Sequence, residues 1–338
     1  MANLEKKVIG VDVSSKILTF SYNNGEQKNV LANICNNKID ILKALKKLSN
    51  EDYKVVVEAT GSYSSKILYY AHLLNFDVFM INPLSIKRYG EVKNNISKTD
   101  EEDAKLIRDF GEKMEMSIYK PKSENLENLD QEMNLWQDLE EEKARLSLKL
   151  KALRHKARVS KDVEKHYEKL LKYLTKQILE VQKRLPKLED EQIKNNKKLL
   201  TSIKGIGEKT ALLLLIATNN FENFSNDKAL SKYFGVAPRL YHSGNKKISL
   251  GKCRTSKSFI RSVLYVCSWS AMKYNPQCKA LYERIVEQGK SKKLALIAIC
   301  NKLLRQAFGV IKNQKQWTKI FFQFQIFYKV IRCIKMTQ

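Results

Sequence analysis

The sequence predicts three parts: an α/β domain at the N-terminus, a central coiled coil and a mostly α-helical C-terminal domain. Strand and helix patterns alternate over the first 118 residues. Residues 122–195 contain a single Pro and no Gly, and helical periodicity dominates from residue 198 onward. We therefore expect domains at 1–118, 119–196 and 197–316. The basic, aromatic tail at 317–338 suggests no role.

The N-terminal domain opens with strand-like patterns. Apolar or alternating runs at 7–13 and 17–22 are typical of strands, and Asn23-Asn24-Gly25 is a strong hairpin signal before a third strand near 27–32. The remaining expected elements are a helix at 38–49, a buried strand at 55–57 ending at Glu58, a helix at 64–74, a strand at 77–81 stopped by Asn82-Pro83, and a helix at 100–114. This order predicts a mixed sheet flanked by helices.

The central segment has the periodicity of a coiled coil. Apolar residues recur every three or four positions from Val163 to Leu188, and an earlier stretch from Leu139 to Leu153 has compatible spacing. We expect two long helices that turn back near residues 158–161. Such a segment serves as a dimerisation arm or as a spacer.

The C-terminal domain is expected to contain a loop-rich interval at 219–257 and two long helices near 258–273 and 292–312. Gly205-Ile206-Gly207 joins two apolar helical runs. This pattern is typical of a helix-hairpin-helix, whose glycines let backbone N–H groups approach a phosphate. An ordinary helix–helix turn is the alternative interpretation.

The charge is distributed unevenly. The chain has a net charge of +26, and residues 196–338 carry 27 Lys and Arg against 5 Asp and Glu, a net of +22. A basic excess confined to one half indicates a polyanionic partner for that half. No stretch approaches the roughly 20 apolar residues of a membrane span, and MANLEKK leads into a strand instead of a signal sequence. Nucleic acid is therefore the expected partner, with no membrane involved.

The six Cys and four His residues show no zinc-site spacing, so free thiols are expected. Carboxylates are the more informative side chains. Asp12 and Glu58 each end an apolar strand, and Asp100 and Asp103 share one face of a first helical turn. Taken singly, each acid is more simply a solvent-facing strand end or a helix-terminus residue favoured by the macrodipole. Together, four hard oxygen donors suit a pair of Mg²⁺ ions acting on a phosphodiester.

A serine in the basic half offers a second kind of chemistry. Ser243 precedes Gly244, which is the commonest setting of a turn serine. A nucleophilic hydroxyl with cations beside it to stabilise a phosphate under attack is the alternative. Six basic residues lie within 16 positions and form either a solvated loop or a DNA-holding surface: Lys246, Lys247, Lys252, Arg254, Lys257 and Arg261.

Motifs along the N-terminal domain resemble the transposases of insertion-sequence family one hundred and ten. They are Gly10-Val11-Asp12-Val13-Ser14-Ser15-Lys16, Glu58-Ala59-Thr60-Gly61, Asn82-Pro83, Lys98-Thr99-Asp100 and Asp103-Ala104, in the family's order over nearly the whole domain. The resemblance implies an RNase H-like (RuvC-like) fold. It also implies that Asp12, Glu58, Asp100 and Asp103 are the catalytic acids that bind Mg²⁺ or Mn²⁺.

The C-terminal half also resembles that family. The matching residues are Ile206-Gly207, Pro238-Arg239, Ser243-Gly244, Ile260-Arg261, Asn275-Pro276, Tyr282 and Lys302-Leu303-Leu304-Arg305. The resemblance implies that Ser243 is a nucleophile that becomes covalently linked to a DNA phosphate. The chain departs from the family at Ser256, which replaces a glycine, so Ser249, Ser256 and Ser258 are rival hydroxyls and the activity of this copy stays an open question.

We therefore expect a transposase or recombinase that cleaves and rejoins DNA at element ends and target. The resemblance further implies an element-encoded structured guide RNA, and a composite site in a homo-oligomer (dimer or tetramer) in which the acids of one subunit meet the serine of another. A bacterial or archaeal cytoplasm, at the nucleoid, is the expected location. The expected nucleic-acid contacts are Gly205, Gly207, Lys209, Arg239, Lys246, Lys247, Lys252, Arg254, Lys257 and Arg261.

Two other functions are also consistent with the sequence. A structure-specific nuclease of the RNase H fold would hydrolyse junction DNA with the carboxylates alone and leave Ser243 inert. A non-catalytic nucleic-acid-binding protein would use the acids only as helix caps, and Asp12→Asn or Glu58→Gln would then leave every activity intact.

Overall fold

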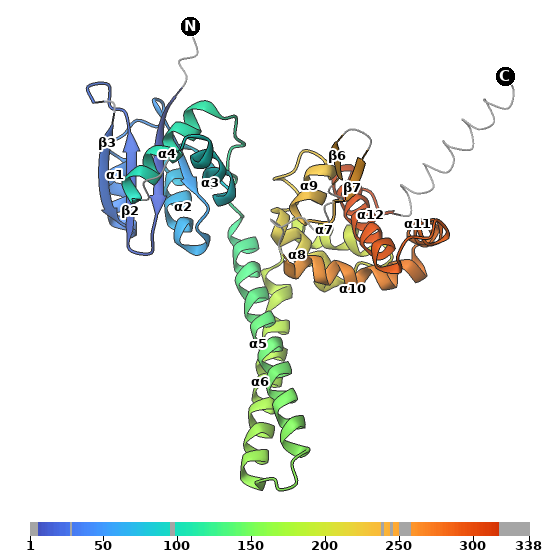
Figure 1. Ribbon diagram of the computed structural model, residues 1–338. Coiled ribbons are helices and arrows are strands. Elements are labelled where there is room, and N and C mark those ends of the chain that lie inside the picture. The colour runs from blue at the N-terminus through green and yellow to red at the C-terminus, as the bar shows by residue number, and fades with distance from the viewer. Residues whose placement is uncertain are drawn as a thin grey trace, which may run out of the picture. The chain divides into compact units, whose positions relative to one another are not determined.

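The computed structural model describes residues 6–27, 29–94, 99–237, 240–243, 246–249 and 258–317. Contacts within the chain define two compact units, Met1–Pro121 and Lys122–Gln338 (Figure 1). Each unit has its own hydrophobic core.

The N-terminal unit is built on a five-stranded mixed sheet with strand order β3-β2-β1-β4-β5. Strand β2 is antiparallel to β1 and β3, whereas β4 is parallel to β1 and β5. The strands are β1 Lys7–Val13, β2 Ile17–Tyr22, β3 Val30–Cys35, β4 Tyr53–Glu58 and β5 Asp77–Ile81. This confirms the predicted RNase H-like α/β sheet. Strand β3 begins later than expected, because the loop after β2 extends to Gln27, whose N–H donates a hydrogen bond to the Asn24 side chain.

Helices cover both faces of this sheet. They are α1 Lys38–Leu45, the short 3₁₀ helix η1 Gly61–Ser64, α2 Ser65–Leu73, α3 Pro83–Val92 and α4 Asp100–Lys113. Helix α3 was not expected, because Asn82-Pro83 was interpreted only as a strand stop. The same two residues begin a helix: the Asn82 side chain accepts a hydrogen bond from the Leu84 N–H at 2.9 Å, and proline at the first helical position has no N–H to leave unpaired.

Helix α4 packs directly against β1. A Cβ at Gly10 would lie 2.5 Å from the Ala104 carbonyl oxygen and 2.5 Å from the Arg108 nitrogen. One α4 glycine makes the reciprocal approach, since a Cβ at Gly111 would lie 2.8 Å from the Val56 side chain. A side chain at either position would push neighbouring atoms apart, so the glycines fix how closely α4 lies on β1 and β4.

The second unit begins with two long antiparallel helices, α5 Glu124–Arg154 and α6 Lys161–Leu188 (Figure 1). Their connection at residues 155–160 agrees with the predicted turn. Ion pairs link the two helices at both ends: Arg154 contacts Glu164, and Arg184 makes a bidentate contact with Glu132. The long helix pair expected from the sequence is therefore confirmed, and its base enters the core of the helical part through buried Leu126, Leu129, Met133 and Leu185.

The rest of this unit is mainly helical. Its elements are α7 Glu191–Thr201, α8 Glu208–Thr218, α9 Asp227–Tyr233, β6 Leu240–Ser243, β7 Lys246–Ser249, α10 Ser258–Tyr274, α11 Pro276–Glu287 and α12 Lys292–Asn313. The two predicted long helices correspond to α10 and α12. Helix α9 and the β6–β7 hairpin lie in the interval expected to be loop-rich, and neither they nor α11 were expected. As in α3, an Asn-Pro pair starts α11, because the Asn275 side chain caps it and Pro276 occupies its first turn.

Helix α12 corrects the expectation that no segment could span a membrane. By length and composition alone, Lys292–Asn313 is long and apolar enough to do so. Packing accounts for most of its apolar side chains, because ten of its residues are buried, among them Leu296, Ile299, Leu303 and Leu304. This helix forms the centre of the C-terminal core.

Candidate active site and nucleic-acid interface

The sheet places Asp12 and Glu58 on the face covered by α4. Successive side chains of a strand alternate between faces. Gly10 and Val56 face α4, so Asp12 and Glu58, each two residues further on, project from the same face. Strands β1 and β4 pair in parallel up to Val11 and Val57, and the two acids are the next residues of their strands. Both carboxylates therefore lie at the carboxyl ends of neighbouring strands.

The first turn of α4 adds the other two acids. The Thr99 hydroxyl caps this helix by accepting a hydrogen bond from the Glu102 N–H at 3.2 Å. Asp100 lies in the first turn, and Asp103 immediately precedes Ala104, the residue whose carbonyl abuts Gly10. The close packing of α4 on β1 thus brings this acidic turn toward Asp12.

The charges on these side chains influence one another. Burial raises the pKa of Asp12, a hydrogen bond from the Val13 backbone opposes that shift, and repulsion from Asp100 and Asp103 raises the pKa further. A cavity of about 560 Å³ lies beside the α4 terminus and is bordered by Thr19, the β2 partner of Asp12 in the sheet, and by Asp100. Three of the four expected acids therefore interact electrostatically, and one of them, Asp100, borders this cavity.

The donor set fits a divalent cation in its chemistry. Carboxylate oxygens are the ligands that Mg²⁺ prefers, and a bound cation relieves repulsion among crowded carboxylates. Within the described ranges, however, no group of three or more His, Cys, Asp or Glu side chains is close enough to hold a metal ion as placed. The acids lie on the sheet face that α4 covers, but as placed their carboxylates do not form a complete set of metal ligands. The four cysteines in the described residues are free thiols, as expected: Cys35, Cys267, Cys278 and Cys300.

Ser243 is the last residue of β6 and pairs across the hairpin with Lys246, while His242 pairs with Lys247. The hairpin tip therefore places the backbone of a serine opposite that of a lysine. Ser249 ends β7 and Ser258 begins α10. The remaining expected residues of this region lie outside the described residues: Arg239, Lys252, Arg254, Ser256 and Lys257.

The glycines between α7 and α8 have different surroundings. Gly205 has a φ of +108°, and a Cβ there would lie 2.6 Å from the Ala271 Cβ, so packing against α10 requires this glycine. Gly207 caps α8, and a Cβ there would meet nothing within 4 Å. The Lys209 ammonium lies 3.8 Å from the centroid of the Trp136 ring. The Gly205 geometry is that of a close helix–helix turn, whereas the α8 terminus at Gly207 keeps the open backbone that a phosphate contact needs.

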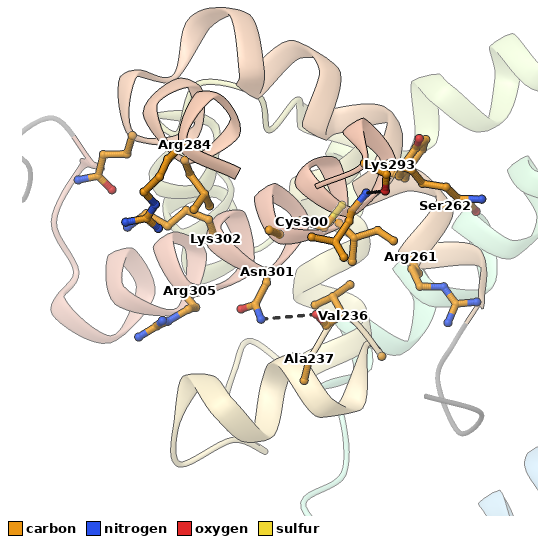
Figure 2. A pocket seen from close by; sticks show the side chains of 18 of the residues that line it. Val236, Ala237, Arg261, Ser262, Arg284, Lys293, Cys300, Asn301, Lys302 and Arg305 are labelled. Atoms are coloured by element: carbon orange, nitrogen blue, oxygen red, sulfur yellow. Dashed lines mark hydrogen bonds between the residues drawn. The ribbon is translucent and has the colours of Figure 1, made fainter. Parts of the chain in front are cut away.

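Sequence reasoning missed a cavity of about 1280 Å³ in the C-terminal unit (Figure 2). Its lining comes from the segment after α9 and from α10, α11 and α12, and it includes Arg261, Arg284, Lys293, Lys302 and Arg305. Arg261 was among the expected contacts, and Lys302 and Arg305 belong to a motif that resembles the family. Lys302 and Arg305 share a helix face at a spacing of three, a local signal that could have drawn attention to them.

Comparison with known proteins identifies the family. Residues 197–283 match the model described as "Transposase IS116/IS110/IS902 family", and residues 9–155 match a DEDD-type transposase model of the same family. The pilin gene-inverting protein of Moraxella bovis is 30% identical over 277 residues, which cover 78% of this chain and 82% of that protein. The chain belongs to the IS110 family of transposases.

The pilin gene-inverting protein of Moraxella lacunata matches to the same extent. The transposase for insertion sequence element IS1111A of Coxiella burnetii is 21% identical over 266 residues, which cover 70% of this chain and 72% of that protein. The expected family is confirmed. This IS110-family transposase is an enzyme that cleaves and joins DNA, and its DEDD domain implies a divalent metal ion.

Proposed function

We propose that this transposase breaks and rejoins DNA through a covalent phosphoserine link at Ser243, assisted by Mg²⁺ (or Mn²⁺) held by Asp12, Glu58, Asp100 and Asp103. The observation that carries the proposal is the arrangement of the acids. Asp12 shares a sheet face with Glu58 and interacts electrostatically with the first turn of α4. A divalent ion, when bound, would polarise the phosphodiester.

The chemistry assigned to Ser243 is an exchange of phosphodiester bonds. The hydroxyl oxygen attacks phosphorus and loses its proton, a serine–phosphate bond forms, and one end of the cut strand leaves as an alcohol. The hydroxyl of another strand end then attacks the same phosphorus and releases the serine, which rejoins DNA without an external energy source. The neighbouring lysines of the hairpin, Lys246 and Lys247, provide positive charge for the phosphate.

The partners follow from charge and family. The net charge of +22 in residues 196–338 supports binding of element ends and target DNA by this half. We also propose inversion as one possible outcome of strand exchange, because two relatives are named pilin gene-inverting proteins. A structured guide RNA and a cytoplasmic, nucleoid-associated location belong to the same proposal through the family resemblance.

A homo-oligomer is supported by the α5–α6 pair. Several large apolar side chains on these helices stay exposed in the single chain, including Leu148, Val163 and Tyr173. A second copy could cover them, and the acids of one subunit could then act with Ser243 of another. Chain-mixing provides the direct test: subunits carrying only Asp12→Asn and subunits carrying only Ser243→Ala should regain activity when combined.

The experiment for the central proposal looks for a denaturant-stable protein–DNA adduct. Purified protein is incubated with Mg²⁺, labelled element-end DNA and RNA transcribed from the flanking region. The adduct should be lost in Ser243→Ala and Asp12→Asn but retained in the matched hydroxyl variants Ser249→Ala, Ser256→Ala and Ser258→Ala. Metal-dependent cleavage that persists in Ser243→Ala would instead support the nuclease that uses carboxylates alone.

A further inference from the structure

The large cavity of the C-terminal unit combines cationic and apolar lining residues. Five cationic side chains line it, and no Asp or Glu is among its lining residues: Arg261, Arg284, Lys293, Lys302 and Arg305. Figure 2 shows these cations in two groups, with Arg284, Lys302 and Arg305 on one side and Arg261 and Lys293 on the other. An anion with more than one charged group therefore has partners at both sides of the cavity.

Two of these three cations are constrained by their surroundings. Arg305 is held by an ion pair with Asp227, with 2.5 Å between Nε and Oδ2. Lys302 is half-buried; its pKa is lowered mainly by burial and further by repulsion from Arg305 and Arg284, with Cys278 acting in the opposite direction. One carboxylate for three cations leaves a positive excess, and an anion bound among them would remove their mutual repulsion.

The rest of the cavity is suited to a flat apolar group. Leu294 and Ile297 of α12 line it, and they remain 49% and 36% exposed. Val236 and Tyr265 extend this surface from the segment after α9 and from α10. A bare phosphate would use the cations and leave this wall in water. A nucleotide matches both surfaces, because it carries a base beside its phosphate.

We propose that this cavity binds one unstacked nucleotide of an unpaired nucleic-acid strand, with its phosphate at Arg284, Lys302 and Arg305 and its base against Leu294 and Ile297. Arg261 and Lys293 then hold the next phosphate along the strand. A duplex keeps its bases stacked inside and offers none to a concave wall, so the cavity selects single strands. This binding role goes beyond the proposed strand exchange and requires neither the metal nor Ser243.

Equilibrium binding to the full-length chain without metal tests the phosphate contacts. Fluorescence anisotropy compares labelled oligo(dT), oligo(U) and a duplex of equal length. The double variant Arg284→Gln/Arg305→Gln should weaken single-strand binding about tenfold, with less than a threefold effect on the duplex. Because both arginines contact the same phosphate, the slope of log K against log salt should fall by at most about 0.7. Stronger binding of oligo(dT) assigns the strand as DNA, and stronger binding of oligo(U) assigns it as RNA.

Two controls make this result specific. Lys279→Gln/Lys312→Gln removes the same charge from α11 and α12 at positions outside the cavity lining and should change all affinities equally and by less than threefold. If Arg284→Gln/Arg305→Gln proves unstable in a thermal melt, Arg284→Gln/Lys293→Gln replaces it. This variant leaves the Arg305–Asp227 pair intact and should show the same loss of single-strand affinity. The proposal would be overturned if the cavity variant lost affinity equally for duplex and single strand. It would also be overturned if Lys279→Gln/Lys312→Gln bound the single strand as weakly as the cavity variant does.

The base contact is tested separately with strands that carry abasic positions. The wild-type chain should bind oligo(dT) about fivefold or more tightly than an abasic strand, because an abasic position lacks the base that would cover the apolar side chains of Leu294 and Ile297. Ile297→Ser should remove most of that preference while leaving the salt dependence unchanged. A preference that is absent in the wild type, or unaltered by Ile297→Ser, would contradict the assignment of a nucleotide.

Discussion

Replacing Gly10 by alanine tests whether the packing of α4 on β1 sets the geometry of the acidic site. The new Cβ would lie 2.5 Å from both the Ala104 carbonyl oxygen and the Arg108 nitrogen. Ordinary contacts need about 3.5 Å, so α4 would have to move by about 1 Å. Both obstructing atoms belong to the helix backbone, and no side chain can rotate to relieve the clash.

We expect two measurable consequences. Overpacking of this kind costs about 1–3 kcal/mol, which lowers the thermal midpoint. The displacement also carries Asp100 and Asp103 away from Asp12, and a misplacement of about 1 Å at a reacting centre can cost about 100-fold in rate. Metal-dependent DNA cleavage should therefore fall by about two orders of magnitude, measured at a temperature where the variant is fully folded.

Gly309→Ala is the matched control, because Gly309 lies within α12 and a Cβ there would meet nothing within 4 Å. It should leave cleavage unchanged and stabilise the helix by at most about 1 kcal/mol. A Gly10→Ala variant with the wild-type thermal midpoint and cleavage rate would refute the reasoning, because α4 would then not be fixed by that contact.

Three further predictions concern stability. Burial raises the pKa of Asp109, but hydrogen bonds led by the one from Lys113 outweigh that effect and lower the pKa from 3.8 to about 2. The ionised carboxylate therefore stabilises the fold by up to about 2 kcal/mol above pH 4, and this contribution is lost as the pH falls toward 2. Chemical denaturation should show the free energy of unfolding falling over this pH range, and Asp109→Asn should remove that dependence. Because burial and like charges raise the pKa of Asp12, its ionised form destabilises the fold, so Asp12→Asn should raise the metal-free thermal midpoint at pH 7 while abolishing cleavage; an unchanged or lower midpoint would contradict this. Gly205→Ala places a Cβ 2.6 Å from Ala271 at a positive φ and should cost about 2 kcal/mol or more, whereas an unaltered midpoint would show that α10 is not held by this turn.

The N-terminal sheet could be predicted because its signals are local. Strand periodicity and strand-end carboxylates indicated where Asp12 and Glu58 lie, and a capped first turn indicated Asp100. What the sequence does not reveal is how closely α4 approaches the sheet. That distance depends on Gly10 and Gly111 meeting atoms far along the chain, and neither glycine sits in a turn that would mark it as special.

Two of the helices missed from the sequence, α3 and α11, share one cause. Asn82-Pro83 and Asn275-Pro276 both favour an extended residue before the proline, which reads as an end of regular structure. The same pair also caps and starts a helix, and tertiary packing decides between the two outcomes. The basic cavity was missed for a different reason, since its lining spans residues 235–305 and no single window of sequence contains it.

The most direct measurement of the central claim is to identify the protein residue that becomes linked to DNA. The adduct formed with Mg²⁺ and element-end DNA is digested with nuclease and protease, and the modified peptide is sequenced by tandem mass spectrometry. We predict a nucleotide joined through its phosphate to the hydroxyl oxygen of Ser243. A modification on Ser249, Ser256 or Ser258 would reassign the nucleophile, and cleaved DNA with no modified peptide would contradict covalent serine chemistry in this transposase.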